Sequence, residues 1–126
     1  TKDPVISLLS EQKEVSNLGG TMRLGAFACR LCPSTKAAEA YGVRNISERH
    51  RHRFEFNNAY KEICEEKGLI FSGIFEEGNL CEVAEIKHHP WMIGVQFHPE
   101  FKSKPTVPHP LFKEFVKSAF SYRNKE

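Results

Sequence analysis

The segment from Trp91 to Phe101 constrains the fold most strongly, because it joins an apolar run to a histidine and a carboxylate on either side of one proline. The run Trp91–Phe97 predicts a buried strand. Pro99 fixes its own φ and favours an extended conformation for the residue before it, so His98 leaves the strand in a defined direction. Any fold of this chain therefore places the end of a core strand beside His98 and Glu100.

The pair His98 and Glu100 is suited to acid–base chemistry. An imidazole changes charge near neutral pH, and a neighbouring carboxylate can fix its tautomer and stabilise its charged form, which activation of a nucleophile requires. The pattern also fits a surface turn that happens to contain both residues. On the catalytic interpretation, the nucleophile has to come from another part of the protein.

Composition and charge exclude several classes of protein. The 126 residues suffice for one domain at most, and the formal net charge of +2 is too small to imply binding to nucleic acid or to a membrane surface. No apolar run approaches the ~20 residues that cross a bilayer, and residues 1–4 have no signal-peptide character. We therefore expect a cytoplasmic protein with no nucleic-acid or membrane partner.

The four cysteines, Cys29, Cys32, Cys64 and Cys81, are expected to be buried free thiols, because most of them lie in apolar periodic stretches. Cys29 and Cys32 form a C-x-x-C pair. A zinc site needs a second pair or suitably spaced histidines, so no metal is predicted there.

Periodicity and turn residues predict strands and helices that fit an α/β architecture. The regular alternation of strand and helix in a complete doubly wound sheet is not visible. The predicted strands are 4–9, 18–30, 46–56, 69–75, 80–86 and 91–97. The predicted helices are 35–41, with Ser34 as N-cap and Gly42 as stop, the segment from Asn57 or Asn58 to Gly68, and a helix that begins at Pro110.

The last helix carries an apolar and largely aromatic stripe at helical spacing. Such a stripe normally faces the interior of a domain, so we expect it to pack in the core. Its members are Leu111, Phe112, Phe115, Val116, Ala119 and Phe120.

The strand predicted over 46–56 separates two kinds of side chain, because alternate residues of a strand share a face. One face carries Arg49, Arg51 and Arg53, and the other carries His50, His52, Phe54 and Phe56. Three arginines on one face repel one another unless anions, carboxylates or a ligand compensate, so this face is an acid-binding surface, a paired structural network or a solvated edge. The two histidines could bind a metal only with further ligands, which the sequence does not place nearby.

Five motifs, in the order found here, resemble the CTP synthase family. They are Gly-Gly-Thr-Met-Arg-Leu-Gly at 19–25, Glu-Arg-His-Arg-His-Arg-Phe-Glu-Phe-Asn-Asn at 48–58, His-Pro-Trp at 89–91, Gly-Val-Gln-Phe-His-Pro-Glu-Phe at 94–101 and His-Pro-Leu-Phe at 109–112. The His-Pro-Glu alone is shared by class I, triad-type glutamine amidotransferases generally. The resemblance implies that residues 1–126 are the C-terminal half of such an amidotransferase domain, whose doubly wound, flavodoxin-like sheet is incomplete in this chain.

The resemblance also implies a reaction. In this family a cysteine thiolate attacks the side-chain amide of glutamine, and the released ammonia passes to a synthetase domain, where UTP phosphorylated by ATP is aminated to CTP. His98 would be the general base and acid, Glu100 its orienter, and Arg53 part of the L-glutamine site. GTP would act as an activator near Gly19–Gly25. Mg and ATP would be bound by the synthetase domain and no cofactor by these residues, and the full-length enzyme would be a homotetramer.

One departure from the family limits the expected activity. The family's nucleophile lies in a Gly-x-Cys-x-Gly elbow, and none of the four cysteines has that context. We therefore expect the nucleophile and the synthetase domain to lie outside these residues, and the residues alone to be inactive. Phe54 stands where many relatives have tyrosine. The alternative function is a non-catalytic anion- or nucleic-acid-binding module that uses the face of Arg49, Arg51 and Arg53.

Overall fold

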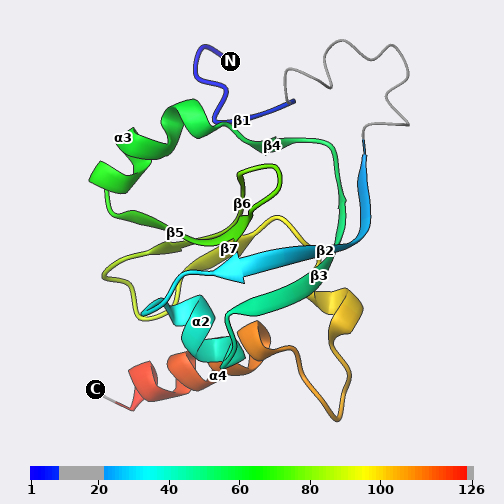
Figure 1. Cartoon of the computed structure of the whole chain (residues 1–126). Helices are drawn as coiled ribbons and strands as arrows, with labels where there is room; N and C mark the ends of the chain where they lie inside the picture. Colours follow the sequence, from blue (N-terminus) through cyan, green and yellow to red (C-terminus); the bar gives the residue numbers. More distant parts are fainter. Residues whose placement is uncertain (9–21, 125–126) are drawn as a thin grey trace.

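A computed structural model describes residues 1–8 and 22–124 of the chain (Figure 1). Five strands form one sheet in the order β3-β2-β5-β6-β7, and β1 pairs with β4 in a two-stranded sheet. The strands are β1 Ile6–Ser7, β2 Arg23–Leu31, β3 Asn45–His52, β4 Glu55–Phe56, β5 Leu69–Phe75, β6 Leu80–Ile86 and β7 Ile93–Val95. The helices are α2 Lys36–Tyr41, α3 Lys61–Glu66 and α4 Pro110–Arg123, with short 3-10 helices η2 Asn58–Tyr60 and η3 Pro99–Lys102.

Helices cover both sides of the sheet, which confirms the predicted α/β class. In Figure 1, α3 lies over one side and α2 and α4 lie over the other. Every strand pair within the described ranges is antiparallel. The parallel strands of the predicted doubly wound sheet are therefore not among the described residues. No helix in the described part of the chain is long and apolar enough to cross a membrane.

Two apolar clusters hold these layers together. Cys29, Leu31, Ala37, Val83, Phe97 and Leu111 form the larger one, and Phe56, Phe71 and Cys81 form the other. Packing is close where β2, β5 and β6 meet at Gly73, since a Cβ there would lie 2.6 Å from Cγ2 of Val83 and 2.9 Å from Sγ of Cys29. A side chain at this position would force the strands apart.

All four cysteines are free thiols, as predicted, but only Cys29 and Cys81 are fully buried. Burial raises the pKa of each of these two thiols to about 12. A thiol with so high a pKa carries almost no thiolate near neutral pH and is a poor nucleophile.

The cap of α2 differs from the prediction. Thr35, not Ser34, is the N-cap: its φ is −112° and its hydroxyl accepts a hydrogen bond from the Ala38 N–H at 3.2 Å. Ser34 has a φ of 59°, which is outside the extended conformation that an N-cap normally adopts. Gly42 ends the helix in the left-handed conformation, as predicted.

The aromatic stripe of α4 contradicts the core prediction. Only Leu111 is buried, while the exposed fractions of Phe112, Phe115, Val116 and Phe120 range from 42% to 64%. Helical periodicity identified one apolar face correctly, but nothing among the described residues covers most of it.

The sheet curls toward its two edges. β2 pairs with β5 only at Arg30 and Leu31, so the β2–β3 hairpin diverges from β5 and β6 along most of its length. The segment after β7 then reaches β3, where the His98 N–H donates to the Arg49 carbonyl at 2.9 Å. The curl encloses polar side chains between β2, β3 and β6.

Candidate functional site

The structure brings the side chains of His98 and Glu100 together. Nδ1 of His98 lies 2.7 Å from Oε1 of Glu100. The hydrogen bond with His98 lowers the pKa of Glu100, so this carboxylate is ionised near neutral pH and can only accept. Nδ1 therefore carries the proton and donates, which leaves the lone pair of Nε2 free to take a proton from another group.

Local backbone geometry places His98 as the sequence predicted. Its φ of −108° and ψ of 91° are extended, and Pro99 begins η3 directly after it. The Phe101 ring stacks on the imidazole with ring centroids 4.9 Å apart. The preceding strand is shorter than predicted, since β7 ends at Val95, although the Gln96 N–H still donates to the Glu82 carbonyl at 2.9 Å.

A groove of about 320 Å³ runs along β2 and β3 and reaches Phe101, whose ring stacks on His98. The exposed Arg49 and Arg51 line it, so its walls carry positive charge. The full lining is Met22, Leu24, Gly25, Arg49, His50, Arg51 and Phe101. Anionic groups are the ligands that such a wall attracts.

Arg53 does not share the face of the other two arginines, which corrects the predicted three-arginine surface. β3 ends at His52, and Arg53 lies in the bend before β4. Phe54 is likewise outside the strand and is 53% exposed. Within the described ranges, the Nε of Arg53 is buried and has no hydrogen-bond partner.

Only part of the segment predicted to lie near an activator is described. Residues 19–21 are outside the described residues, and β2 begins at Arg23. The Arg23 side chain points inward and is buried, whereas Leu24 is 67% exposed. Gly25 has a φ of +100°, a conformation that L side chains rarely adopt.

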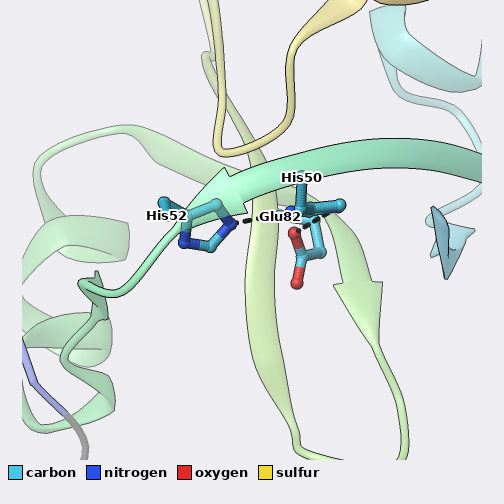
Figure 2. Close-up of side chains that lie close together, drawn as sticks. All are labelled: His50, His52 and Glu82. Atoms are coloured by element: carbon cyan, nitrogen blue, oxygen red, sulfur yellow. Dashed lines mark hydrogen bonds and ion pairs between the residues drawn. The ribbon is translucent and has the colours of Figure 1, made fainter. Parts of the chain in front are cut away.

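Behind the groove lies a buried polar cluster that the sequence did not predict. Nη1 of Arg23 contacts Oε1 of Glu82 and lies 3.2 Å from Oε1 of Glu55. Figure 2 shows the side chains of His50, His52 and Glu82 close together, with dashed lines for the contacts between them. Nδ1 of His50 lies 2.7 Å from Nε2 of His52, and Nε2 of His50 lies 3.3 Å from Oε2 of Glu82. The signal in the sequence is polar residues at inward-facing positions of strands that otherwise read as apolar.

The protons in this cluster can be assigned from its acceptors. Nδ1 of His52 lies 3.0 Å from the Phe54 carbonyl, which can only accept, so this nitrogen donates. Burial lowers the pKa of His52, and lowers that of His50 to about 3, so both rings are neutral. Nε2 of His52 must then accept from Nδ1 of His50, which leaves Nε2 of His50 as an acceptor facing Glu82.

Two acceptors would face each other across 3.3 Å unless Glu82 carries a proton. Burial raises the pKa of Glu82, and raises that of Glu55 despite the opposing effect of Arg23. A protonated Glu82 leaves Arg23 and Glu55 as a neutral pair. The cluster then holds no net charge, as a site at this depth requires.

Glu82 also supplies the third ligand that the metal interpretation of His50 and His52 lacked, because the three side chains offer ligand atoms within 4.8 Å of one another. The sequence did not predict this juxtaposition, since Glu82 comes from β6. However, the guanidinium of Arg23 already contacts the same carboxyl group. A positively charged side chain in direct contact with a potential ligand disfavours a divalent ion, so we assign no metal to the cluster.

Comparisons with known proteins agree with the resemblance. The sequence profile of the family described as glutamine amidotransferase class-I matches residues 4–118. The CTP synthase of Symbiobacterium thermophilum is 62% identical over 97% of this chain and 23% of its own length. The CTP synthase of Protochlamydia amoebophila is 60% identical over 100% of this chain and 23% of its own length.

A solved structure is similar as well. The glutaminase domain of Trypanosoma brucei CTPS with bound acivicin has a TM-score of 0.83 and 31% identity, over 93% of this chain and 46% of that one. The chain thus spans about a quarter of the length of the curated relatives. The match to the family profile covers most of the chain, which therefore belongs to the class-I glutamine amidotransferases.

Proposed function

We propose that this chain is the base-bearing half of the glutaminase domain of a CTP synthase, in which glutamine hydrolysis supplies ammonia for the ATP-dependent amination of UTP. The observation that carries the proposal is the 2.7 Å contact between His98 and Glu100, which fixes the tautomer needed for a general base. The motifs at 19–25 and 94–101 and the names of the similar proteins support the specific reaction.

His98 would act twice. Its Nε2 takes the proton of a cysteine thiol as the sulfur attacks the glutamine amide, and then gives that proton to the departing ammonia. The resulting thioester is hydrolysed by water, which His98 activates in the same way. Glu100 stabilises the imidazolium formed in each half.

The nucleophilic cysteine would come from residues outside this chain. Cys29 and Cys81 are buried with raised pKa values. Cys32 lies after β2, where its Sγ donates to the Phe71 carbonyl at 3.4 Å, and Cys64 lies in α3. Among the described residues, none of the four thiols makes a hydrogen bond with His98 or Glu100.

Arg53 would hold the carboxylate of L-glutamine, because the planar guanidinium can pair with a carboxylate through two hydrogen bonds. The synthetase domain of the same protein would bind Mg and ATP and receive the ammonia. The proposal also includes GTP as an activator near 19–25 and a homotetrameric full-length enzyme located in the cytoplasm.

The test uses the full-length enzyme with His98→Ala. We expect glutamine-dependent CTP formation to fall by at least about 10³-fold, because a triad without its base retains only residual catalysis. CTP formation from added ammonia should persist, since it bypasses glutamine hydrolysis.

His88→Ala is the matched control, because His88 is an exposed histidine of the turn before β7. It should leave both activities unchanged. Glutamine-dependent activity that survives in His98→Ala would overturn the proposed role of the base. Loss of the ammonia-dependent activity as well would mean that the variant damages more than the glutaminase.

A further inference from the structure

The segment that carries the His98–Glu100 pair is held to β3 at three successive points. The His98 N–H donates to the Arg49 carbonyl at 2.9 Å. Nζ of Lys102 donates to the Ser47 carbonyl at 2.6 Å. Nε2 of His109 contacts Oε1 of Glu48 at 2.8 Å. Three consecutive residues of β3 therefore receive the start, the middle and the end of one loop.

The middle contact comes from the same 3-10 helix as Glu100. Lys102 is the last residue of η3, and Glu100 lies in the same single turn of 3-10 helix. The amine of Lys102 is charged, so its hydrogen bond to the Ser47 carbonyl is of the strong, charge-assisted kind. It also lies 3.9 Å from Oε1 of Glu48, a carboxylate that is 1% exposed.

Glu48 anchors this arrangement to the rest of the domain. Nδ1 of His109 accepts from the Leu111 N–H at 3.2 Å, so its proton lies on Nε2, which donates to Glu48. The Tyr41 hydroxyl also donates to Oε1 of Glu48, at 2.8 Å, since burial and this hydrogen bond raise the pKa of the phenol. One buried carboxylate thus joins β3 to α2 and to the N-cap residue of α4.

Glu100 itself has little to hold it. Its side chain is 56% exposed, and within residues 1–8 and 22–124 its only side-chain hydrogen bond is the one with His98. An exposed carboxylate loses rotamer entropy when it is fixed, so its contact with the imidazole depends on where its backbone stands. That position is set by η3, and η3 is tied to β3 through Lys102.

We propose that Lys102 is a positioning residue for the His98–Glu100 pair, acting through its hydrogen bond to the Ser47 carbonyl. The inference rests on the proposed function, in which Glu100 stabilises the imidazolium. When the tether is lost, η3 moves relative to β3, the Glu100 carboxylate meets Nδ1 less often, and His98 is a weaker base. Glutamine binding does not depend on this contact.

The test compares Lys102→Met with Lys104→Met in the full-length enzyme. Methionine keeps the length and apolar stem of lysine but cannot donate. Lys104 is an exposed lysine two residues further on whose side chain has no hydrogen bond or ion pair among the described residues. We expect Lys102→Met to lower the glutaminase kcat by about tenfold, which corresponds to one charged hydrogen bond, with the KM for glutamine unchanged. Lys104→Met should match the wild type.

Three readouts separate positioning from a general structural effect. The acid limb of the pH profile of kcat should move to lower pH in Lys102→Met, because a less stabilised imidazolium loses its proton more readily. In a background of Glu100→Gln, Lys102→Met should cost less than twofold, since the carboxylate that it positions is already gone. Lys102→Arg, which restores a cationic donor, should recover most of the rate.

The outcomes distinguish this inference from the proposed function. If His98→Ala abolishes glutaminase activity but Lys102→Met is as active as the wild type, the inference is wrong and the proposed function stands. A tenfold loss that is fully additive with Glu100→Gln also overturns it. If His98→Ala retains glutaminase activity, the proposed function and the inference fall together.

Discussion

Two regions of the domain reverse the usual distribution of side chains. One lies between β2, β3 and β6, and the other is the exposed face of α4. The first is buried, and yet it holds an arginine, two glutamates and two histidines. The second is aromatic, and most of it is exposed. In the polar region the charge of Arg23 is paired with Glu55 and Glu82, whereas the exposed face of α4 makes few contacts within the described residues.

The difference shows what burial depends on in this domain. Arg23 is 8% exposed because Glu55 and Glu82 accept from it and because the rings of Phe27 and Phe75 lie 4.4 and 4.8 Å from its guanidinium carbon. Partners, not hydropathy, allow that charge inside. The following predictions test whether the contrast between the two regions holds in energetic terms.

The largest effect is expected for Arg23→Met. Removal of the guanidinium leaves the carboxyl groups of Glu55 and Glu82 buried without their partner, which should cost about 3–5 kcal/mol in the free energy of unfolding. Arg30→Met is the control on the same strand: Arg30 pairs with Glu76 at the surface, with 54% of its side chain exposed, and should cost less than about 1 kcal/mol. Urea denaturation measures both. Equal losses would mean that the buried cluster is not held by its charges.

Leu111→Ala tests how much the buried part of α4 contributes to stability, because Leu111 is the one member of the α4 stripe that is buried. It belongs to the larger apolar cluster with Val83 and Phe97. We expect a loss of about 3 kcal/mol in urea denaturation, the usual cost of a cavity left by a buried leucine. A loss below about 1 kcal/mol would show that α4 does not pack on the sheet in solution.

The pH dependence of stability tests the protons of the cluster. The pKa of His50 is lowered to about 3, so between pH 6.5 and pH 5 only the unfolded chain gains this proton, and stability falls as pH falls. The pKa of Glu82 is raised by burial, so its contribution has the opposite sign and stability rises as pH falls. In the wild type the two contributions oppose each other.

Variants separate these contributions. Glu82→Gln mimics the protonated carboxyl group and removes its titration, so this variant should lose more stability than the wild type between pH 6.5 and pH 5. His50→Gln removes the opposing contribution, so it should lose less than the wild type over the same range, by about 1.5 kcal/mol. Urea unfolding at the two pH values measures both. Parallel curves for the two variants would contradict the proton assignment.

Some of these features could be predicted from the sequence and others could not. Pro99 dictates the extended backbone of His98 locally, and the next residue but one is near enough to meet the imidazole, so the pair was predictable. The cluster around Arg23 was not, because its partners come from β4 and β6 and meet only when the sheet curls.

The prediction of a three-arginine face was wrong for a local reason. The prediction that the α4 stripe packs in the core was wrong for a general one. Alternation held from Arg49 to Arg51, but the chain bends at Arg53 before β4, and a period-two pattern contains no signal for where a strand stops. Periodicity also says which residues share a helix face, yet it does not say what covers that face. Leu111 is buried because it packs with Val83 and Phe97 in the larger apolar cluster, whereas most of the stripe stays exposed.

The smallest effect is expected for Phe115→Ala. Phe115 lies in the middle of the stripe and is 55% exposed, so it should contribute less than about 1 kcal/mol to the free energy of unfolding, whereas a buried phenylalanine costs about 3–5 kcal/mol when truncated. Phe71, which is 5% exposed in the second apolar cluster, supplies that buried comparison as Phe71→Ala. Urea denaturation at several protein concentrations measures both variants. A loss at Phe115 as large as that at Phe71 and dependent on concentration would mean that copies of the protein bury this face against each other, and the contrast between the two regions would then disappear on assembly.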